Sequence, residues 1–380
     1  MKILYVATIS NTINAFLIPH IELLLKQGHQ VDIACNVNRE IDSKLINRGC
    51  KVFDVPFQRS PLKKENYGAY KGVREIIKSG KYDIVHTHTP VASTCVRLAC
   101  RNIENIKVLY TAHGFHFFKG APIKNWLLYY PIEKWLSKYT DVLITINQED
   151  YARAKSKFKA KKVKYVPGVG LDTEKFKRVK VDKNVKRKVL GVPDDAFVIL
   201  SVGELNKNKN HETIIKAIAK LENPNIYYVI CGVGPLREYL EGLAQEYHIS
   251  GNVKFLGYRT DIAEICKASD VFAFPSKREG LGLAALEAMA SGLPLVTSNI
   301  HGITDYSVNG KTGYTCNPSD VSGFATALSE LAGDPQRSIR IGLNNITTVG
   351  RYDIYSVLSK LKDVYGMDQE DSLTVKRGAQ

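Results

Sequence analysis

The chain has 380 residues, of which 44% are hydrophobic and 24% charged. These proportions exclude a disordered, collagen-like or coiled-coil protein, and the length predicts two domains, each with its own core. Seven scattered cysteines with no Cys-x-x-Cys pair favour a reducing cytoplasm. No apolar run free of charges and turn-formers reaches about eighteen residues, so we expect neither a transmembrane helix nor a secreted chain.

The net charge of +15 is distributed unevenly. Residues 1–172 hold 27 Lys and Arg against 14 Asp and Glu, whereas residues 173–380 hold 26 against 24. The excess positive charge predicts that the first half faces an anionic partner, which is a nucleic acid, a membrane surface or a phosphorylated substrate. Charge alone does not choose among the three.

Short apolar runs alternate with helix-length stretches in the first half, which is the pattern of βαβ units with a parallel sheet. We interpret the lysine-dense run 155–164 as the solvated face of a helix. Pro and Gly interrupt the periodicity at 166–170, and we place the hinge there and in the charge-rich stretch that extends to about Asp195. The expected strands of the first domain are 2–8, 30–36, 83–89, 108–113 and 142–148.

The same pattern begins again after residue 195, so the predicted fold class is α/β with two Rossmann-like domains. We expect the parallel sheets to face a central cleft, because such folds bind ligands at the carboxyl ends of their strands. The expected domains are 1–172 and 173–352, with a C-terminal helix and tail, 353–380, packing back on the first domain. The expected strands of the second domain are 197–202, 226–231, 253–256, 271–275 and 295–298, and the last helix is 353–365.

The most informative segment is 274–294, where a strand, a loop, a helix and a turn follow one another. Gly280 and Gly282 allow a ligand to approach the backbone, and the first amide groups of the helix make an anion site. Glu279 ends the loop, and Glu287 lies about one turn into the helix. Both carboxylates can then face a diphosphate flanked by hydroxyl-bearing rings. The simpler alternative is a helix-entry carboxylate and a solvated helix residue.

This segment resembles the retaining glycosyltransferases of family four, which have the two-domain GT-B fold and a signature of Glu, seven residues and Glu. The resemblance covers nearly the whole chain. A nonhydrolysing UDP-sugar epimerase shares the architecture, but the signature from Glu279 to Glu287 argues against it. The other matching segments are 166–176, 200–203 with Lys209, 231–235, 253–258 and 309–314.

The resemblance implies a donor site for a UDP-sugar. Glu279 would bind hydroxyls of the donor sugar and Glu287 those of the ribose, while Lys209 would stabilise the charge that develops on the β-phosphate. Backbone amides of residues 280–283, which we call the glycine loop, would hold the phosphates. Tyr258 and Arg259 would border the nucleobase. The implied donor-binding residues are Gly203, Tyr258, Arg259, Gly280, Leu281, Gly282, Leu283 and Glu287, and the implied catalytic residues are His113, Lys209 and Glu279.

Two positions depart from the family pattern. Glu204 stands where the family commonly has an Arg that helps to neutralise the diphosphate, so the remaining lysine acts alone or Arg278 compensates. The segment 9–14 lacks the usual glycine pair that contacts phosphate or acceptor. Its small polar side chains, Asn11 and Asn14 among them, would replace those backbone contacts with side-chain hydrogen bonds.

Histidines end two strands of the first domain, with His86 and His88 on one and His113 on the next. The resemblance makes His113 the best candidate to contact the donor sugar and the leaving phosphate. His86 and His88 line the acceptor side together with Asn11 and Asn14, or they merely stiffen the strand end. The spacing also suggests metal ligation, but no carboxylate or Cys accompanies the histidines in a zinc pattern, and we expect neither a metal nor another cofactor.

The segment 119–139 combines both tryptophans of the chain with tyrosines and lysines. Such a combination suits a bilayer interface, whereas the alternative is a core helix whose Trp126 and Trp135 pack against the sheet. Further cations that would reach the same anionic surface are Lys63, Lys64, Lys71 and Arg74.

The resemblance therefore implies a bacterial hexosyltransferase that retains anomeric configuration without a metal. It would move a hexose or N-acetylhexosamine from a UDP-sugar to a polyprenyl diphosphate-linked oligosaccharide for capsule or exopolysaccharide. It would be cytoplasmic, peripheral on the inner face of the cell membrane, and associated with other polysaccharide-assembly proteins. One alternative is a GT-B glycosyltransferase with diacylglycerol or a soluble metabolite as acceptor. Another is a basic nucleic-acid-binding protein, although no helix-turn-helix, finger or RNA-recognition signature accompanies the charge.

Overall fold

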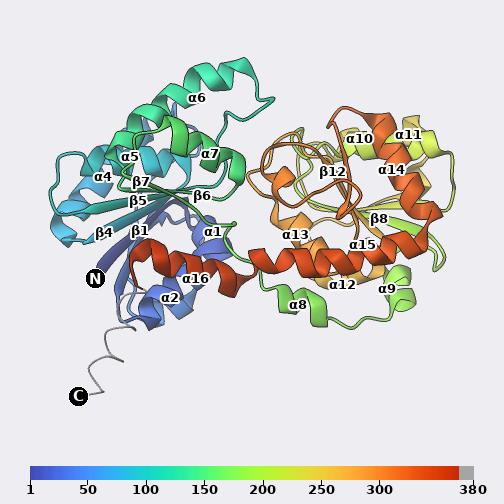
Figure 1. Cartoon of the computed structure of the whole chain (residues 1–380), viewed down its shortest axis with the longest axis horizontal. Coiled ribbons are helices and arrows are strands. Elements are labelled where there is room, and N and C mark those ends of the chain that lie inside the picture. The colour runs from blue at the N-terminus through green and yellow to red at the C-terminus, as the bar shows by residue number, and fades with distance from the viewer. Residues whose placement is uncertain (368–380) are drawn as a thin grey trace. The chain divides into compact units, whose positions relative to one another are not determined.

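The computed structural model describes residues 1–367, and the chain divides into two compact units. Among the described residues, the first unit consists of Met1–Gly170 with the segment 354–367, and the second is Leu171–Asp353. Each unit has one parallel sheet with helices between successive strands (Figure 1). The predicted α/β class with two Rossmann-like sheets is confirmed.

The first sheet has seven strands in the order β3-β2-β1-β4-β5-β6-β7. Two of them were not predicted, because both are short and lie at the ends of the sheet. The prediction for 155–164 is wrong in its second half, since the helix ends at Lys157 and Lys162 begins a strand whose lysines alternate with half-buried residues. Lysines blunt an edge strand against further pairing. The strands are β1 Lys2–Ile9, β2 Gln30–Asn36, β3 Val52–Asp54, β4 Ile84–His88, β5 Lys107–Ala112, β6 Val142–Thr145 and β7 Lys162–Tyr165.

Alternating residues of β1 enter two separate cores, as the two-residue period of a strand requires. Tyr5 lies in the core that contains residues of α2 and α16, whereas Leu4 and Val6 lie in the core under α4 and α5. The last described helix of the chain thus packs within the first unit. The helices of this unit are α1 Ser10–Thr12, the π-helix η1 Ile13–Leu17, α2 Ile18–Lys26, α3 Ser43–Asn47, α4 Glu65–Gly80, α5 Pro90–Cys100, α6 Ile123–Leu136, η2 Ser137–Tyr139, α7 Gln148–Lys157 and α16 Ile354–Tyr365.

The second sheet has six strands in the order β10-β9-β8-β11-β12-β13. The order reverses direction between β8 and β11, which places the loops that follow these two strands beside each other at the carboxyl ends. The last strand, β13, was not predicted, because it has only four residues and directly follows a glycine-bearing turn at 309–312. The strands are β8 Phe197–Val202, β9 Ile226–Cys231, β10 Val253–Phe255, β11 Val271–Phe274, β12 Leu295–Ser298 and β13 Gly313–Cys316.

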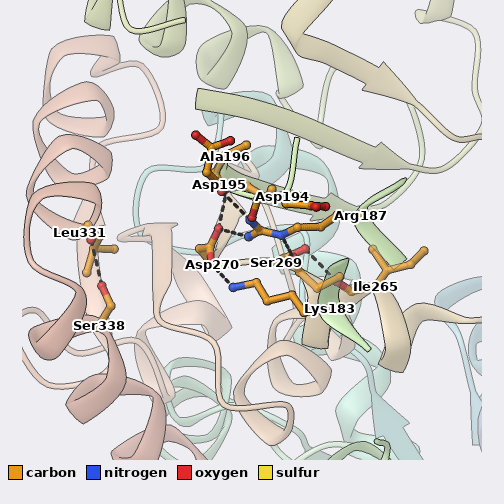
Figure 2. Close-up of polar contacts among 12 residues, drawn as sticks. Lys183, Arg187, Asp194, Asp195, Ala196, Ile265, Ser269, Asp270, Leu331 and Ser338 are labelled. Atoms are coloured by element: carbon orange, nitrogen blue, oxygen red, sulfur yellow. Dashed lines mark hydrogen bonds and ion pairs between the residues drawn. The ribbon is translucent and has the colours of Figure 1, made fainter. Parts of the chain in front are cut away.

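The charge-rich stretch that we interpreted as a hinge contains two helices that belong to the second unit. Arg187 in α9 is buried, and its guanidinium donates to the carbonyl oxygens of Asp194 and Ala196 and to Asp270 Oδ2 at 2.6–2.8 Å (Figure 2). The interdomain character of this stretch is therefore limited to its beginning. The helices of this unit are α8 Thr173–Arg178, α9 Lys183–Leu190, α10 His211–Leu221, α11 Arg237–Glu246, η3 Ser250–Asn252, α12 Ile262–Ala268, α13 Leu283–Ala290, η4 His301–Asp305, α14 Val321–Gly333, α15 Pro335–Thr348 and η5 Val349–Tyr352.

A hollow of about 590 Å³ adjoins Arg187 at the amino ends of β8 and β11. Lys183 and Arg187 line it, but Asp270 pairs with both cations, at 2.7 and 2.6 Å. The hollow lies at the opposite end of the strands from the glycine loop, so we assign these charges to holding α9 against the sheet. Across residues 1–367, no helix combines the length and the apolar run that a bilayer span requires.

Candidate functional site

The loops after β8 and β11 are joined by one backbone hydrogen bond and by two bonds from asparagine side chains to backbone carbonyls. These bonds lie at the carboxyl edge of the second sheet, the edge formed by the carboxyl ends of its strands. Lys277 N donates to Asn208 O at 2.8 Å, and Asn208 Nδ2 donates to the carbonyl of Arg278 at 3.0 Å. The buried Asn210 adds a bond from Nδ2 to Pro275 O at 3.0 Å. These bonds bring the loop that carries Lys209 beside the loop that carries Glu279.

Lys209 and Glu279 form an ion pair at this edge, with 2.6 Å between Nζ and Oε1. Their side chains are 21% and 14% exposed, so the pair is largely shielded from water while remaining open to a ligand. The Lys209 ammonium also lies 4.8 Å from the centre of the Phe274 ring. The structure thus brings together two of the three residues that we predicted to be catalytic.

The glycine loop has the geometry of a close backbone approach. Gly282 has a φ of +92°, and a Cβ atom there would lie 2.5 Å from the Phe274 ring, so only glycine fits. The helix α13 begins at the next residue, and its first amide groups lack partners within the helix. Tyr306 fixes the loop by donating its hydroxyl to Leu281 O at 2.8 Å. We did not predict Tyr306, because no local pattern links it to a loop 25 residues away.

Glu287 lies in the first turn and a half of α13 and is half-buried, which does not fit the alternative of a solvated helix residue. Burial raises the pKa of its carboxyl group to about 7, and the positive charge of Lys175 on α8 opposes this rise. A carboxyl group with this pKa changes its protonation state near neutral pH. Such groups are concentrated at functional sites.

Tyr258 and Arg259 differ in how available their side chains are. The Tyr258 side chain is 78% exposed, which leaves its ring open to stacking. The Arg259 guanidinium is held by Asp261 through bonds of 2.8 and 2.6 Å. Gly203 lies nearby, where a Cβ on Gly232 would come within 1.9 Å of its carbonyl oxygen. The remaining glycine-loop residues that we predicted, Gly280 and Leu283, are half-buried.

The departure at Glu204 is visible in the structure. Its side chain is exposed and accepts a hydrogen bond from Asn206 Nδ2 at 2.9 Å. Arg278, the residue that we expected to compensate, is also exposed, and its backbone carbonyl rather than its guanidinium joins the two loops. Compensation by Arg278 stays a prediction.

The carboxyl edge of the first sheet carries the histidines. His88 Nδ1 lies 3.0 Å from His113 Nε2, and the rings of His86 and His88 are 4.3 Å apart. Burial lowers the pKa of His113 to about 4, with a contribution from His20, and it lowers the pKa values of His86 and His88 well below their usual range. All three rings are therefore neutral near pH 7. His113 is half-buried.

The other predicted acceptor-side residues are less accessible than we expected. His86 and His88 are 0% and 1% exposed, so they fit the alternative in which they stiffen the strand end. Asn14 uses both amide atoms internally, since Nδ2 donates to Glu40 O at 2.8 Å and Oδ1 accepts from Asp42 N at 3.1 Å. The proposed replacement of backbone contacts by Asn14 is thus not what the structure shows.

Helix formation explains this difference. The segment after β1 is helical, and its polar side chains hold the loop 38–42 in place. Buried Ser10 donates to Asn38 Oδ1 at 2.9 Å. Asn11 is half-buried on the first turn, and its predicted acceptor contact stays a prediction.

The aromatic segment 119–139 fits one interpretation in one part and the other interpretation in another part. Trp126 is half-buried and packs against Phe117, with 5.8 Å between the ring centres, whereas Trp135 is 46% exposed. Arg97 and Glu133 form a buried ion pair at 2.9 Å that attaches α6 to α5. The opposite side of α6, an outer helix in Figure 1, carries exposed apolar residues at helical spacing. These are Ile123, Leu127, Leu128, Ile132 and Trp135.

In the described part of the chain, no group of three or more His, Cys, Asp or Glu residues is arranged to hold a metal ion. The histidines at the first carboxyl edge bond to one another or to hydroxyl groups instead, as His86 Nε2 does with Thr111 Oγ1 at 2.8 Å. The seven cysteines are free and buried.

Comparisons with known proteins match both units. The family model described as glycosyl transferases group 1 matches residues 182–347, and the model described as glycosyl transferase 4-like matches residues 2–147. The Bacillus subtilis (strain 168) protein EpsD, named as a glycosyltransferase, is 36% identical over 96% of each chain. An Escherichia coli protein is 31% identical over 90% of each chain, and its name is UDP-Gal:alpha-D-GlcNAc-diphosphoundecaprenol alpha-1,3-galactosyltransferase.

Solved structures share the fold at lower identity. Anabaena Alr3699/HepE in complex with UDP and glucose superposes with a TM-score of 0.80 at 20% identity, covering 96% of this chain and 99% of that one. WaaG, described as a glycosyltransferase involved in lipopolysaccharide biosynthesis, gives a TM-score of 0.75 at 17% identity and covers 95% and 99%. At this level of identity the likeness concerns the fold alone.

Proposed function

The chain belongs to family four of the glycosyltransferases, with the GT-B fold, and on that premise we propose that it transfers a hexose or N-acetylhexosamine from a UDP-sugar to a lipid-linked oligosaccharide. The observation that carries the donor half of the proposal is the pairing of Lys209 with Glu279 beside the first turn of α13. A cation, a carboxylate and the first amide groups of a helix lie there on adjacent loops. This combination suits a sugar joined to a diphosphate.

The assigned roles follow from the chemistry of each group. Lys209 and the first amides of α13 would stabilise the negative charge on the departing nucleoside diphosphate. Glu279 would bind hydroxyls of the donor sugar, and Glu287 would bind the ribose as a carboxylate. The exposed ring of Tyr258 would stack on the base. From the first unit, the family resemblance assigns His113 to the donor sugar and the leaving phosphate.

We further propose that transfer retains the anomeric configuration and needs no metal. The bond between the anomeric carbon and the β-phosphate oxygen breaks, and the acceptor hydroxyl oxygen bonds to that carbon from the same face. The acceptor proton passes to the departing phosphate oxygen, so no protein nucleophile is required. Support comes from the lysine and the helix amides, which supply positive potential where the leaving charge develops.

A lipid-linked acceptor is supported by the name of the Escherichia coli relative, which includes a diphosphoundecaprenol substrate. Support from this chain comes from α6 and the following η2, because exposed lysines accompany the exposed apolar residues of α6, with Lys124 in its first turn and Lys138 in η2. Apolar and cationic side chains together favour binding at an anionic lipid surface. We therefore place the protein on the inner face of the cell membrane, in capsule or exopolysaccharide synthesis.

Thermal protection by nucleotides tests the donor half. The purified protein is melted with UDP, GDP, ADP and a panel of UDP-sugars in buffer that contains EDTA, because a bound ligand raises the melting temperature. We expect protection by UDP and by one UDP-sugar. Lys209→Ala should weaken that protection, whereas Lys188→Ala, which removes an exposed lysine of the same unit, should not. Absence of protection by every nucleotide would contradict the donor site.

Vesicle sedimentation tests the membrane half. We expect the protein to bind vesicles of phosphatidylglycerol and phosphatidylcholine but not of phosphatidylcholine alone, and to be released by salt. Leu127→Ser should reduce binding, because Leu127 is 74% exposed on α6. Leu343→Ser is the matched control, since Leu343 is 62% exposed on α15 of the other unit. Equal loss of binding in both variants would contradict a role for α6.

A further inference from the structure

Glu204 raises a question that the proposed function does not answer, which is why a carboxylate stands beside a diphosphate site. The backbone around it is firmly placed. Leu205 is fully buried, its N–H donates to Val233 O at 3.1 Å, and its carbonyl accepts from Leu236 N at 3.0 Å. The backbone position from which the Glu204 side chain extends is therefore well defined.

The Glu204 carboxylate accepts a hydrogen bond from the side-chain amide of Asn206, whose Nδ2 lies 2.9 Å from Oε2. The oxygen of the same amide faces the other way. It accepts from the backbone N–H groups of Asn208 at 3.0 Å and of Lys209 at 2.9 Å. Asn206 thus uses its amino group on Glu204 and its oxygen on the turn that leads into Lys209.

Residue 204 and the two backbone N–H groups together select which way this amide points. A carboxylate only accepts hydrogen bonds, so it selects the orientation in which Nδ2 faces Glu204 and Oδ1 faces the backbone N–H groups. An arginine only donates, and it would favour the flipped amide, whose amino group cannot accept from Asn208 and Lys209. An arginine at position 204, the residue that the family commonly has there, would therefore disrupt this turn.

The turn formed by residues 206–209 determines where the Lys209 side chain lies. The backbone and side chain of Asn208 bond to the 277–278 backbone, and the next residue directs its ammonium to Glu279 Oε1 at 2.6 Å. A Cβ on Gly203 would lie 3.0 Å from the Lys209 side chain, so that side chain runs directly over the start of the loop. Rotation of the turn would move the ammonium away from Glu279.

We propose that Glu204 is a positioning residue, which orients the Asn206 amide and through it holds Lys209 at the diphosphate of the donor. The proposal rests on the proposed function for its ligand. Glu204 itself makes no contact with the phosphates in this account. Its exposure to water weakens its repulsion of them, because water screens exposed charges strongly.

Donor affinity in three variants tests the chemistry at residue 204. Glu204→Gln keeps an oxygen that can accept from Asn206, so we expect an affinity close to wild type by titration calorimetry with the protecting UDP-sugar. Glu204→Ala and Glu204→Arg should each weaken binding about fivefold, since each removes that acceptor. Glu246→Ala, which removes an exposed carboxylate on α11, is the matched control. Tighter binding by Glu204→Arg, or equal losses in the Gln and Ala variants, would overturn the proposal.

A double-mutant cycle tests whether the effect passes through the lysine. If Glu204 acts by placing Lys209, then Glu204→Ala should cost no further affinity in a Lys209→Ala background. A full additional loss there would show that Glu204 acts on the ligand by another route, and would overturn the proposal.

Hydrogen exchange separates this proposal from the donor assignment, because it needs no ligand. In the free protein we expect the Lys209 amide to exchange faster in Asn206→Ala and in Glu204→Ala than in wild type, and at the wild-type rate in Glu204→Gln. Unchanged exchange in Glu204→Ala would overturn the positioning role. If the wild-type protein binds no nucleotide but the exchange rates are as expected, the donor site is contradicted. The coupling between Glu204, Asn206 and the turn would then still hold as a property of the loop.

Discussion

The carboxyl edges of the two sheets carry different functional groups, although both units have the same kind of fold. The first edge holds neutral, hydrogen-bonded imidazoles, whereas the second holds a charged pair, Lys209 and Glu279. The unit with the large positive excess thus has uncharged histidines at this edge, and surplus lysines such as Lys63 and Lys124 lie exposed elsewhere. Net charge along a sequence therefore indicates a surface that attracts anions, and it does not locate the residue that binds a particular phosphate.

Removal of the Glu279 charge tests the second edge and should have the largest effect. Glu279→Gln leaves a side chain of equal size that can no longer neutralise Lys209 or accept strongly from sugar hydroxyls. We expect turnover of the UDP-sugar to fall roughly a thousandfold with the melting temperature nearly unchanged. Glu246→Gln is the control, and near-normal turnover in Glu279→Gln would contradict its assignment to the donor.

Truncation of His113 tests whether the neutral edge takes part in the reaction. His113→Ala should lower turnover about a hundredfold, because it removes a positioned group without removing a charge. His116→Ala, in the same loop, serves as the control, since the centre of the His116 ring lies 4.7 Å from that of the Tyr129 ring. A similar loss in both variants would assign the effect to the loop and not to His113.

The carboxyl group of Glu287 makes donor binding depend on pH. Burial favours its protonated form in the folded protein and raises its pKa to about 7, so its favourable contribution to stability is complete below its unfolded pKa and is lost as pH rises through about 7. Ribose binding requires the carboxylate, so affinity should rise about tenfold between roughly pH 6 and 8. A UDP-sugar is the suitable probe, because its diphosphate is a diester whose charge is constant over this range.

Glu287→Gln provides the comparison. This variant should bind the UDP-sugar with an affinity that hardly changes between the same two pH values, measured by titration calorimetry. A tenfold change that persists in the variant would assign the dependence to another group.

The smallest expected effect concerns Tyr258. Tyr258→Leu should weaken UDP binding about fivefold, because it replaces a stacking ring with an aliphatic side chain, whereas Tyr258→Phe should bind as wild type does. Fluorescence titration with UDP measures both. Equal weakening in the two variants would indicate that the hydroxyl, and not the ring, contacts the nucleotide.

The fold was predictable because hydrophobic periodicity repeats in both halves, and the expected strands from Gln30, Phe197, Ile226 and Leu295 have the bounds that the structure shows. The missed strands β3, β7 and β13 are only three or four residues long. Such segments offer too few positions for a period of two to be recognised.

The site was predictable only in part. The family motif nominated Lys209 and Glu279 separately, but their contact joins residues 70 apart in sequence and depends on the two loops meeting after β8 and β11. The role of Asn206 escaped notice, although three asparagines at alternate positions of the loop are a signal of side-chain turns. The internal use of Asn14 could not be foreseen, because its partners lie on a separate loop.

Because α16 follows the second unit in the sequence, the two units are completed in a fixed order during synthesis. The second unit ends at Asp353, so a ribosome releases all of its residues before the first unit has received its last helix. Until then Tyr5 and His86 lack the hydroxyl of Tyr365, to which both bond in the finished protein, and the core lacks Val357 and Leu361. The surroundings of His86 are thus completed last, and a nascent chain can hold all residues of its second unit while its first unit still lacks a helix.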